Sequence, residues 1–222
     1  MNNSVTHTAR LLGAGLRALL VLTLLTGVLY PLAVTGVAQA LFPGRANGSE
    51  VRADGRVVGS SLIGQRYDLP LKEGQQSPSP DLKWFQGRPA NGLGANTLNT
   101  RYALLLSGAT NLAADNKVLV QQVRDAKAAV VRDNSVPGHP VRASDVPADA
   151  VTSSGSGLDP DISPQYARLQ VHRVAARNGL SVPQVEKLVT EHTEGRTLGF
   201  LGEPRVNVLQ LNIALKNLVA ER

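Results

Sequence analysis

The hydrophobic pattern of the chain changes at about residue 42. From Ala18 to Phe42 there are 25 consecutive residues without a charge, "ALLVLTLLTGVLYPLAVTGVAQALF". As a helix this run would span about 37 Å, more than the roughly 30 Å of a bilayer's hydrocarbon core. Beyond it, short apolar groups alternate with polar, glycine and proline residues. The pattern therefore predicts a tail and transmembrane helix in residues 1–42 and one soluble domain in residues 43–222.

Proline and several small residues interrupt the apolar run. Pro31 lacks a backbone donor and frees a carbonyl one turn earlier, which we expect a hydroxyl such as that of Thr26, or a neighbouring helix, to satisfy. Small side chains allow close helix contact in lipid. The run thus predicts a packed helix, and the residues expected at its contact are Gly27, Tyr30, Pro31, Thr35 and Gly36.

A cleavable signal peptide is the alternative for this segment. Arg10 and Arg17 give a basic start, and Ala38-Gln39-Ala40 has the form of a cleavage site. The apolar stretch before that site is about 20 residues, however, whereas a signal peptide uses about 7–15. A retained anchor is the prediction we carry forward. The short basic head favours a cytoplasmic N-terminus and an extracytoplasmic domain.

In the domain, the first signals are those of strands and loops. Asp54-Gly55 between short apolar segments predicts a β-hairpin. Residues 66–99 are rich in Gly, Pro, Ser and Asn, and predict a long loop anchored by Trp84-Phe85.

Helical spacing dominates the rest. Asp115 or Asn116 is expected to cap a helix through Val131, and a linker follows over residues 134–147. Ser163, with Pro164 behind it, predicts the start of a second helix that Gly179 ends. The third helix begins with a capping box, Ser181 and Gln184, and the last starts near Val206 or Asn207. The fold class predicted is mixed α/β (α+β), with a short sheet and several helices.

Composition and motifs exclude several functions. The net charge of +6 comes from scattered basic residues, so no nucleic-acid surface is expected. The chain has no cysteine, and its four histidines, His7, His139, His172 and His192, are isolated along it, so neither a metal site nor a serine nucleophile with its base is expected.

The stretch "SSGSGLDPDISP", residues 153–164, has the look of a phosphate loop but not its spacing. After Gly155 and Gly157 the third glycine of a dinucleotide loop is replaced by Pro160. Asp159 and Asp161 could serve as acid and base, but aspartates at such a turn more often bond the backbone two residues on. The stretch predicts a sharp turn that starts a helix.

Seven ordered segments nevertheless resemble one known family. They are "TGVLYPLAVTGVAQALFPGRANGS", "GSSLIGQ", "WFQGRP", "SGATNL", "VTSSGSGLDPDISP", "QVHRVAARNGL" and "GFLGEPRVNVLQLNIAL". Together they cover nearly the whole chain. On these segments the chain is identified as a member of the KdpC family, the C subunit of Kdp-type potassium-transporting ATPases.

The resemblance implies a role inside a cell inner-membrane complex that transports potassium. Its partners would be a channel-like potassium subunit and a phosphorylated P-type ATPase subunit, with this single-pass chain as a non-catalytic accessory. The family also carries a proposal that the subunit assists ATP binding as a catalytic chaperone. The positions that would carry that role, or an assembly role, are Ser154, Gly155, Ser156, Gly157, Leu158, Asp159, Pro160 and Gln170.

Two positions depart from the family pattern. Ala113-Ala114-Asp115 stands where a Gly-Pro or similar turn is usual, and Asp161 stands where histidine is common. A role that rests on that histidine cannot be transferred. No bound cofactor is expected, and ATP enters only through the family proposal. Against ATP, the residues from Ser154 to Gly157 include no Lys or Arg to neutralise phosphate.

Overall fold

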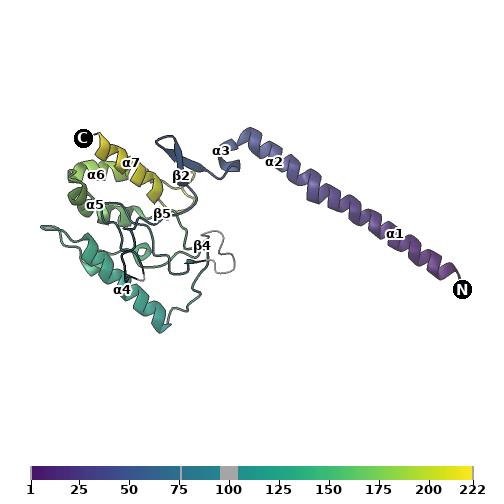
Figure 1. The fold of residues 1–222 in the computed structure, drawn as a ribbon, viewed down its shortest axis with the longest axis horizontal. Coiled ribbons are helices and arrows are strands. Elements are labelled where there is room, and N and C mark those ends of the chain that lie inside the picture. Colours follow the sequence, from purple (N-terminus) through teal and green to yellow (C-terminus); the bar gives the residue numbers. More distant parts are fainter. Residues whose placement is uncertain (1, 76, 96–104, 222) are drawn as a thin grey trace. The chain divides into compact units, whose positions relative to one another are not determined.

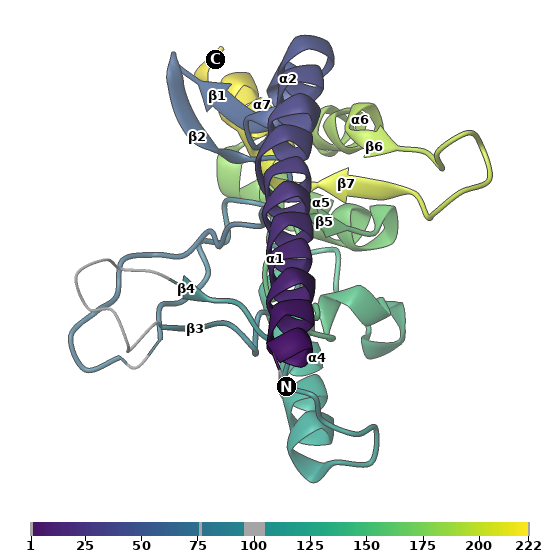
Figure 2. The same ribbon diagram turned by 90° about the vertical axis from the view of Figure 1, so that its right-hand side faces the viewer.

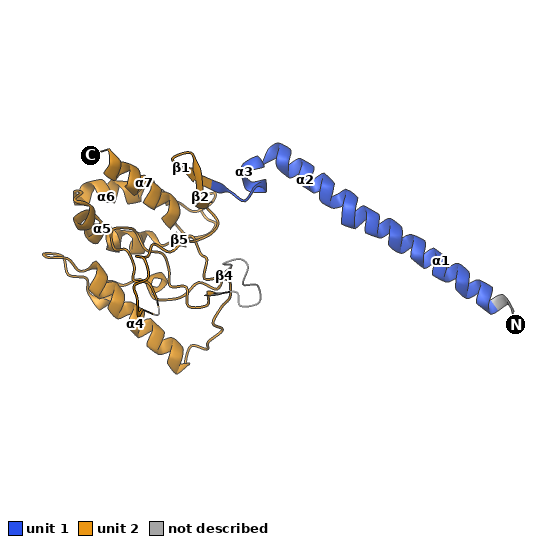
Figure 3. Ribbon diagram, viewed as in Figure 1, with its two compact units in different colours: residues 1–50 blue, residues 51–222 orange. Residues whose placement is uncertain are grey.

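The computed structural model describes residues 2–75, 77–95 and 105–221. The chain divides into two compact units, residues 1–50 and residues 51–222 (Figure 3). It is a mixed helix and sheet protein with one long apolar N-terminal helix and a small domain that contains the sheets, as the pattern predicts (Figure 1). The predicted division at residue 42, which concerns the edge of the membrane segment, stays a prediction.

The N-terminal unit is almost entirely helical. It consists of α1 (Asn2–Leu24), a π-helical turn (Leu25–Leu29), α2 (Tyr30–Leu41) and the short α3 (Pro43–Ala46). The stretch Ser4–Leu41 is long and apolar enough to cross a membrane, and none of it is buried within the chain. An apolar surface of this extent is stable only when lipid or another protein covers it.

The π-helical turn lies directly before Pro31. The Tyr30 N–H donates to the Leu25 carbonyl, five residues back, and so the helix widens where proline removes a donor. The expectation for Thr26 was wrong: its hydroxyl donates to the Leu22 carbonyl at 2.7 Å, one turn before the carbonyl that Pro31 leaves free. Threonine in a helix bonds most readily to the carbonyl four residues back, which fixes this partner.

In the second unit, helices surround a small antiparallel sheet. The helices are α4 (Lys117–Asn134), α5 (Pro164–Asn178), α6 (Val182–Glu191) and α7 (Val208–Ala220), with 3₁₀ turns at Ala143–Asp145 and Ala148–Ala150. The strands are β1 (Glu50–Ala53), β2 (Arg56–Ser60), β3 (Gly94–Ala95), β4 (Leu105–Leu106), β5 (Asp161–Ile162), β6 (Thr193–Glu194) and β7 (Arg205–Asn207). The central sheet has the order β5-β7-β6, while β1 pairs with β2 and β3 with β4.

The caps predicted from sequence are confirmed. The Asn116 side chain accepts from the Val118 N–H at the start of α4, and Ser163 Oγ accepts from the Tyr166 N–H at the start of α5. Gly179 ends α5 with a left-handed φ of 66°. Ser181 and Gln184 form the capping box of α6, and Asn207 caps α7.

The predicted hairpin at Asp54-Gly55 is β1–β2. The segment predicted as a linker, residues 134–147, differs from the prediction in two places. Asn134 is the last residue of α4, and Ala143–Asp145 form a 3₁₀ turn.

The core forms where α5, α6 and α7 pack on the central sheet (Figure 2). Its fully buried members include Val171 and Val174 of α5, Val185 of α6 and Leu211 of α7. One loop residue joins them, because Phe85 is completely buried. The predicted anchor of the long loop is thus confirmed, and the loop is tied into the core instead of lying loosely on it. Residue 76 and residues 96–99 of that loop lie outside the described residues.

Candidate functional site

The long loop is held by polar side chains that α5 and α7 turn inward. Asn212 of α7 bonds both backbone groups of Phe85: its Oδ1 accepts the N–H and its Nδ2 donates to the carbonyl, each at 2.9 Å. Gln170 of α5 does the same for Gln86, at 2.7 and 3.0 Å. Two side-chain amides therefore bond to consecutive residues of the loop much as a neighbouring strand would.

Arg173 lies beside these amides, with 1 % of its surface exposed. It donates to the carbonyls of Leu82 and Trp84, to Asn134 Oδ1 at 2.9 Å, and to Gln170 Oε1 at 2.6 Å. Burial lowers the pKa of the guanidinium to about 10, which still leaves it charged at neutral pH. Because all four acceptors are neutral, the charge is stabilised by hydrogen bonds to oxygen dipoles. We call Gln170, Arg173 and Asn212 the loop clamp.

The clamp gives Gln170 an internal role. The side chain is fully buried, and both ends of its amide are occupied by Gln86 and Arg173. In this conformation it offers no polar atom to a ligand. Its place among the predicted nucleotide or assembly positions stays a prediction.

The serine–glycine stretch is a turn braced by two other loops. Ser156 Oγ accepts the Leu158 N–H, and the Gly157 N–H donates to the Ser154 carbonyl. From outside the turn, Ser107 Oγ donates to the Ser156 carbonyl at 2.7 Å, and Ser153 Oγ accepts the Asn91 N–H at 3.0 Å. Ser154 is buried, whereas Gly155 and Ser156 are exposed.

The rest of the stretch leads into the sheet and α5. Asp159 Oδ1 accepts the Asp161 N–H at 3.1 Å, which confirms the turn-forming interpretation for Asp159. The Asp161 carboxylate instead accepts from Asn207 Nδ2 and pairs with Arg205, each at 3.3 Å. The other carboxylate oxygen of Asp159 forms an ion pair with Arg88 at 2.8 Å, a cation that motif analysis missed because it comes from a different loop. The Pro160 carbonyl accepts the Val208 N–H. The stretch therefore links the long loop, the sheet and α7.

Beside this turn lies a cavity of about 590 Å³. Gly157, Leu158 and Asp159 form one wall, and Arg88 and Leu93 belong to the opposite loop. Its lining combines glycine, leucine and isoleucine with three charged residues, Arg66, Arg88 and Asp159. Both arginines are paired with aspartates, so the cavity does not resemble a cradle of amides around phosphate.

The description of the histidines as isolated was wrong for two of them. The rings of His139 and His172 are stacked, with centroids 3.4 Å apart and planes 12° from parallel. The turn at Val136–His139, with Gly138 at a φ of 79°, brings the first ring onto α5. Helical spacing carries no information about a loop that folds back, and so no sequence pattern predicted this contact. No group of three or more metal-ligating side chains occurs among residues 2–75, 77–95 and 105–221.

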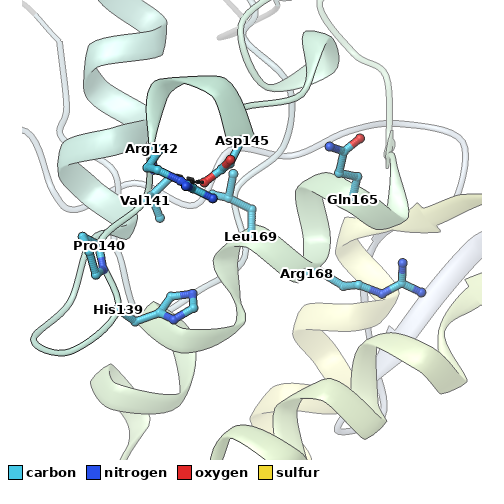
Figure 4. Close-up of a pocket in the computed structure, with 8 residues that line it drawn as sticks. All are labelled: His139, Pro140, Val141, Arg142, Asp145, Gln165, Arg168 and Leu169. Atoms are coloured by element: carbon cyan, nitrogen blue, oxygen red, sulfur yellow. Dashed lines mark hydrogen bonds and ion pairs between the residues drawn. The ribbon is translucent and has the colours of Figure 1, made fainter.

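The His139 ring also borders an open pocket of about 560 Å³ (Figure 4). Arg142 in this pocket is paired with Asp145 at 3.2 Å, which lowers the pKa of that carboxyl. Gln165 and Arg168 of α5 line its other side.

The stacked pair predicts a pH dependence of stability. Burial, and then the charge of His139, lowers the pKa of His172 below 6.5, although Glu186 opposes the shift. The folded state therefore binds this proton less readily than the unfolded state, so stability is full above about pH 6.5 and falls as the pH drops through that value. We expect the thermal midpoint of the full-length chain to fall between pH 7.5 and 5.0, and His172→Gln to flatten the profile. Parallel profiles for the two proteins would contradict this.

Comparison with known proteins gives one consistent result. The family model described as "KdpC: K+-transporting ATPase, c chain" matches residues 12–217. The protein named "Potassium-transporting ATPase KdpC subunit" of Streptomyces coelicolor is 76% identical over 220 residues, covering 99% of this chain and 98% of the relative. The protein of the same name from Streptomyces avermitilis is 75% identical over 220 residues, with 99% of each chain covered. That of Gemmatimonas aurantiaca is 46% identical over 209 residues, or 92% of this chain and 94% of the relative. The resemblance recognised in seven segments is thus confirmed along the whole chain, which belongs to the KdpC family of potassium-transporting ATPase subunits.

Proposed function

We propose that the chain is a non-catalytic accessory subunit of a high-affinity, ATP-driven potassium uptake complex. Its helix anchors it in the cell inner membrane, with the N-terminus in the cytoplasm and the domain outside. There it stabilises assembly and caps the channel-like potassium subunit, while a P-type ATPase subunit of the same complex supplies the energy. Membership of the KdpC family, whose members are named as subunits of a potassium-transporting ATPase, is the observation that carries this proposal.

The geometry of the domain supports a structural role. The serine–glycine turn and the loop clamp hold the polar groups that most resemble a ligand-binding site. These groups bond chiefly to the chain's own backbone. Such bonds hold loops in place and leave few groups free for chemistry.

The helix supports a contact with a neighbouring membrane subunit. A Cβ at Gly27 would have only the Thr23 methyl nearby, at 3.9 Å, and one at Gly36 would meet nothing within 4 Å. The chain itself therefore has no steric need for glycine at either position. A closely approaching partner helix would need it.

We accordingly expect Gly27→Leu to reduce recovery of the complex severalfold when the partner subunits are purified by affinity. The cause would be loss of close packing beside the π-helical turn and Pro31. Val28→Leu adds bulk at the next position round the helix, and should leave recovery unchanged. Equal recovery of the Gly27→Leu and wild-type complexes would contradict the packing.

The catalytic-chaperone role is the second candidate, and sidedness separates it from the first. Because the chain has no cysteine, Gly155→Cys creates a unique thiol, at an exposed position where a Cβ meets nothing within 4 Å. A membrane-impermeant maleimide should label this thiol in intact spheroplasts. Labelling only after the membrane is opened would place the turn in the cytoplasm, where ATP is available, and would favour the chaperone role.

A further inference from the structure

The dipeptide Asn-Gly occurs three times in the chain, at Asn47-Gly48, Asn91-Gly92 and Asn178-Gly179. Asparagine is chemically labile, and most so before glycine, which has no Cβ to shield its backbone nitrogen and which lets the chain take up the conformation for reaction. Loss of the side-chain amide needs a glycine N–H that can attack, an amide that is not held, and a backbone that can rotate. The fold provides these conditions unequally at the three dipeptides.

The dipeptide at the end of α5 is held at both reacting groups. Asn178 Nδ2 donates to the carbonyls of Lys83 and Val174, at 2.8 and 2.9 Å. The Gly179 N–H donates to the Ala175 carbonyl and so caps the helix. Attack by this nitrogen would break the cap and pull the amide away from two acceptors. We therefore expect Asn178 to be protected by the fold.

The dipeptide after α3 is held in a similar way. Asn47 and Gln39 bond to each other through both ends of their amides, at 3.1 Å each, and Asn47 Nδ2 also donates to the Pro43 carbonyl at 2.8 Å. The Gly48 N–H donates to the Arg45 carbonyl at 3.2 Å. Here too the nitrogen and the amide that must meet are both engaged.

The third dipeptide, Asn91-Gly92, lies in a turn of the long loop, where the Asn91 side chain is exposed to water. Its Nδ2 reaches one acceptor, Gln122 Oε1, at 3.5 Å, which is the outer limit of a hydrogen bond. Within residues 2–75, 77–95 and 105–221, the Gly92 N–H donates no hydrogen bond. Of the three dipeptides, this one therefore has the least restrained amide and a nitrogen that can attack it.

We propose that Asn91-Gly92 is a site of spontaneous deamidation in the folded chain. The Gly92 nitrogen loses its proton and attacks Asn91 Cγ, and the side-chain nitrogen takes up a proton and leaves as ammonia. Water then opens the succinimide ring. Cleavage of the bond from nitrogen to Cγ gives aspartate, and cleavage of the bond from nitrogen to the main-chain carbonyl carbon gives isoaspartate. The net reaction is hydrolysis of an amide by water, and it does not depend on the proposed function.

The isoaspartate product does not fit the loop as it is packed. The Asn91 N–H donates to Ser153 Oγ at 3.0 Å, which joins this turn to the serine–glycine stretch. A Cβ at Gly92 would overlap the backbone carbonyl of Gly108, so there is no room beside this residue for added atoms. Isoaspartate inserts a methylene into the backbone at this point, and the loop must give up the bond to Ser153 or the contact with Gly108. Aspartate keeps the ordinary backbone and both contacts.

The test is the rate of amide loss at each dipeptide of the full-length chain in detergent. Aged samples would be digested, the peptides identified by mass spectrometry, and isoaspartate separated from aspartate by chromatography. We expect Asn91 to react severalfold faster than Asn47 and Asn178 in the folded chain. In denaturant all of them should react at similar rates, because only the dipeptide then matters. A rate at Asn91 no higher than that at Asn178 in the folded chain would overturn the proposal.

Asn91→Gln is the matched control for the structural consequence, because glutamine keeps the amide but must close a larger ring to react. As isoaspartate accumulates in the wild type, the backbone amides of residues 86–93 should exchange with deuterium faster than in the fresh protein. Asn91→Gln aged for the same time should exchange there as its own fresh sample does. Unchanged exchange in a wild-type sample rich in isoaspartate would refute the loss of loop contacts.

Discussion

Replacing Arg173 with methionine should lower the free energy of unfolding of the full-length chain by about 4 kcal/mol. The side chain donates to two loop carbonyls and to the side-chain oxygens of Asn134 and Gln170, all in a region from which water is excluded. Methionine fills much of the same volume but donates nothing. Each acceptor left unpaired in the interior costs about 1–3 kcal/mol, with partial relief where water enters. Denaturant unfolding in detergent would measure the loss.

Arg177→Met is the matched control on the same helix. Arg177 is exposed in the last turn of α5, where its charge contributes at most about 1 kcal/mol through the helix dipole. A loss at Arg173 no larger than that at Arg177 would mean that the loop clamp is not what fixes residues 82–86. Arg173→Lys should fall between the two, because an ammonium group cannot reach all four acceptors of the planar guanidinium.

The helices could be predicted because their signals are local. Ser163, Gly179 and the pair Ser181–Gln184 mark ends by capping groups that lie within a few residues of each other. The hairpin at Asp54-Gly55 is local in the same sense. Such features depend on backbone conformation at one point of the chain, which residue type largely decides.

The loop clamp could not be predicted in the same way, because it joins segments about 80–130 residues apart. One signal was present, however. Gln170 and Arg173 are polar residues within the apolar stripe formed by Ala167, Val171 and Val174. A polar side chain on a buried face needs a hydrogen-bond partner there, so these positions pointed to something polar packed on α5. The pattern did not indicate which segment of the chain supplies these hydrogen-bond partners.

The stacked histidines and the π-helical turn show two further limits. His139 reaches His172 only because the turn after α4 folds back, and no periodicity describes such a turn. At Pro31 the sequence located the disturbance of the helix correctly. The partner assigned to Thr26 was nonetheless wrong, since the helix adjusts its own backbone bonding before the proline.

The second large effect is expected at Gly64, where alanine should lower the free energy of unfolding by about 3 kcal/mol. The Gly64 N–H donates to the Leu158 carbonyl at 2.8 Å, so the loop after β2 lies directly against the serine–glycine stretch. A Cβ at Gly64 would stand 2.4 Å from the Asp159 carbonyl oxygen. That atom is backbone and cannot rotate away. In the variant, either the hydrogen bond from Gly64 to Leu158 breaks or the turn at Asp159 shifts. Chemical denaturation would measure the resulting loss in the free energy of unfolding.

Alanine at the motif glycines provides the comparison within the same stretch. Gly155 has open space around it and an ordinary φ, so Gly155→Ala should change stability by less than about 0.5 kcal/mol. Gly157 has a φ of 70° and would bring a Cβ to 3.1 Å from that of Leu93, so its alanine variant should lose about 1–2 kcal/mol. The order Gly64, Gly157, Gly155 follows if contact with the neighbouring loops is what shapes the turn. If Gly155→Ala were as destabilising as Gly64→Ala, contact with the neighbouring loops would not explain the need for glycine at position 155.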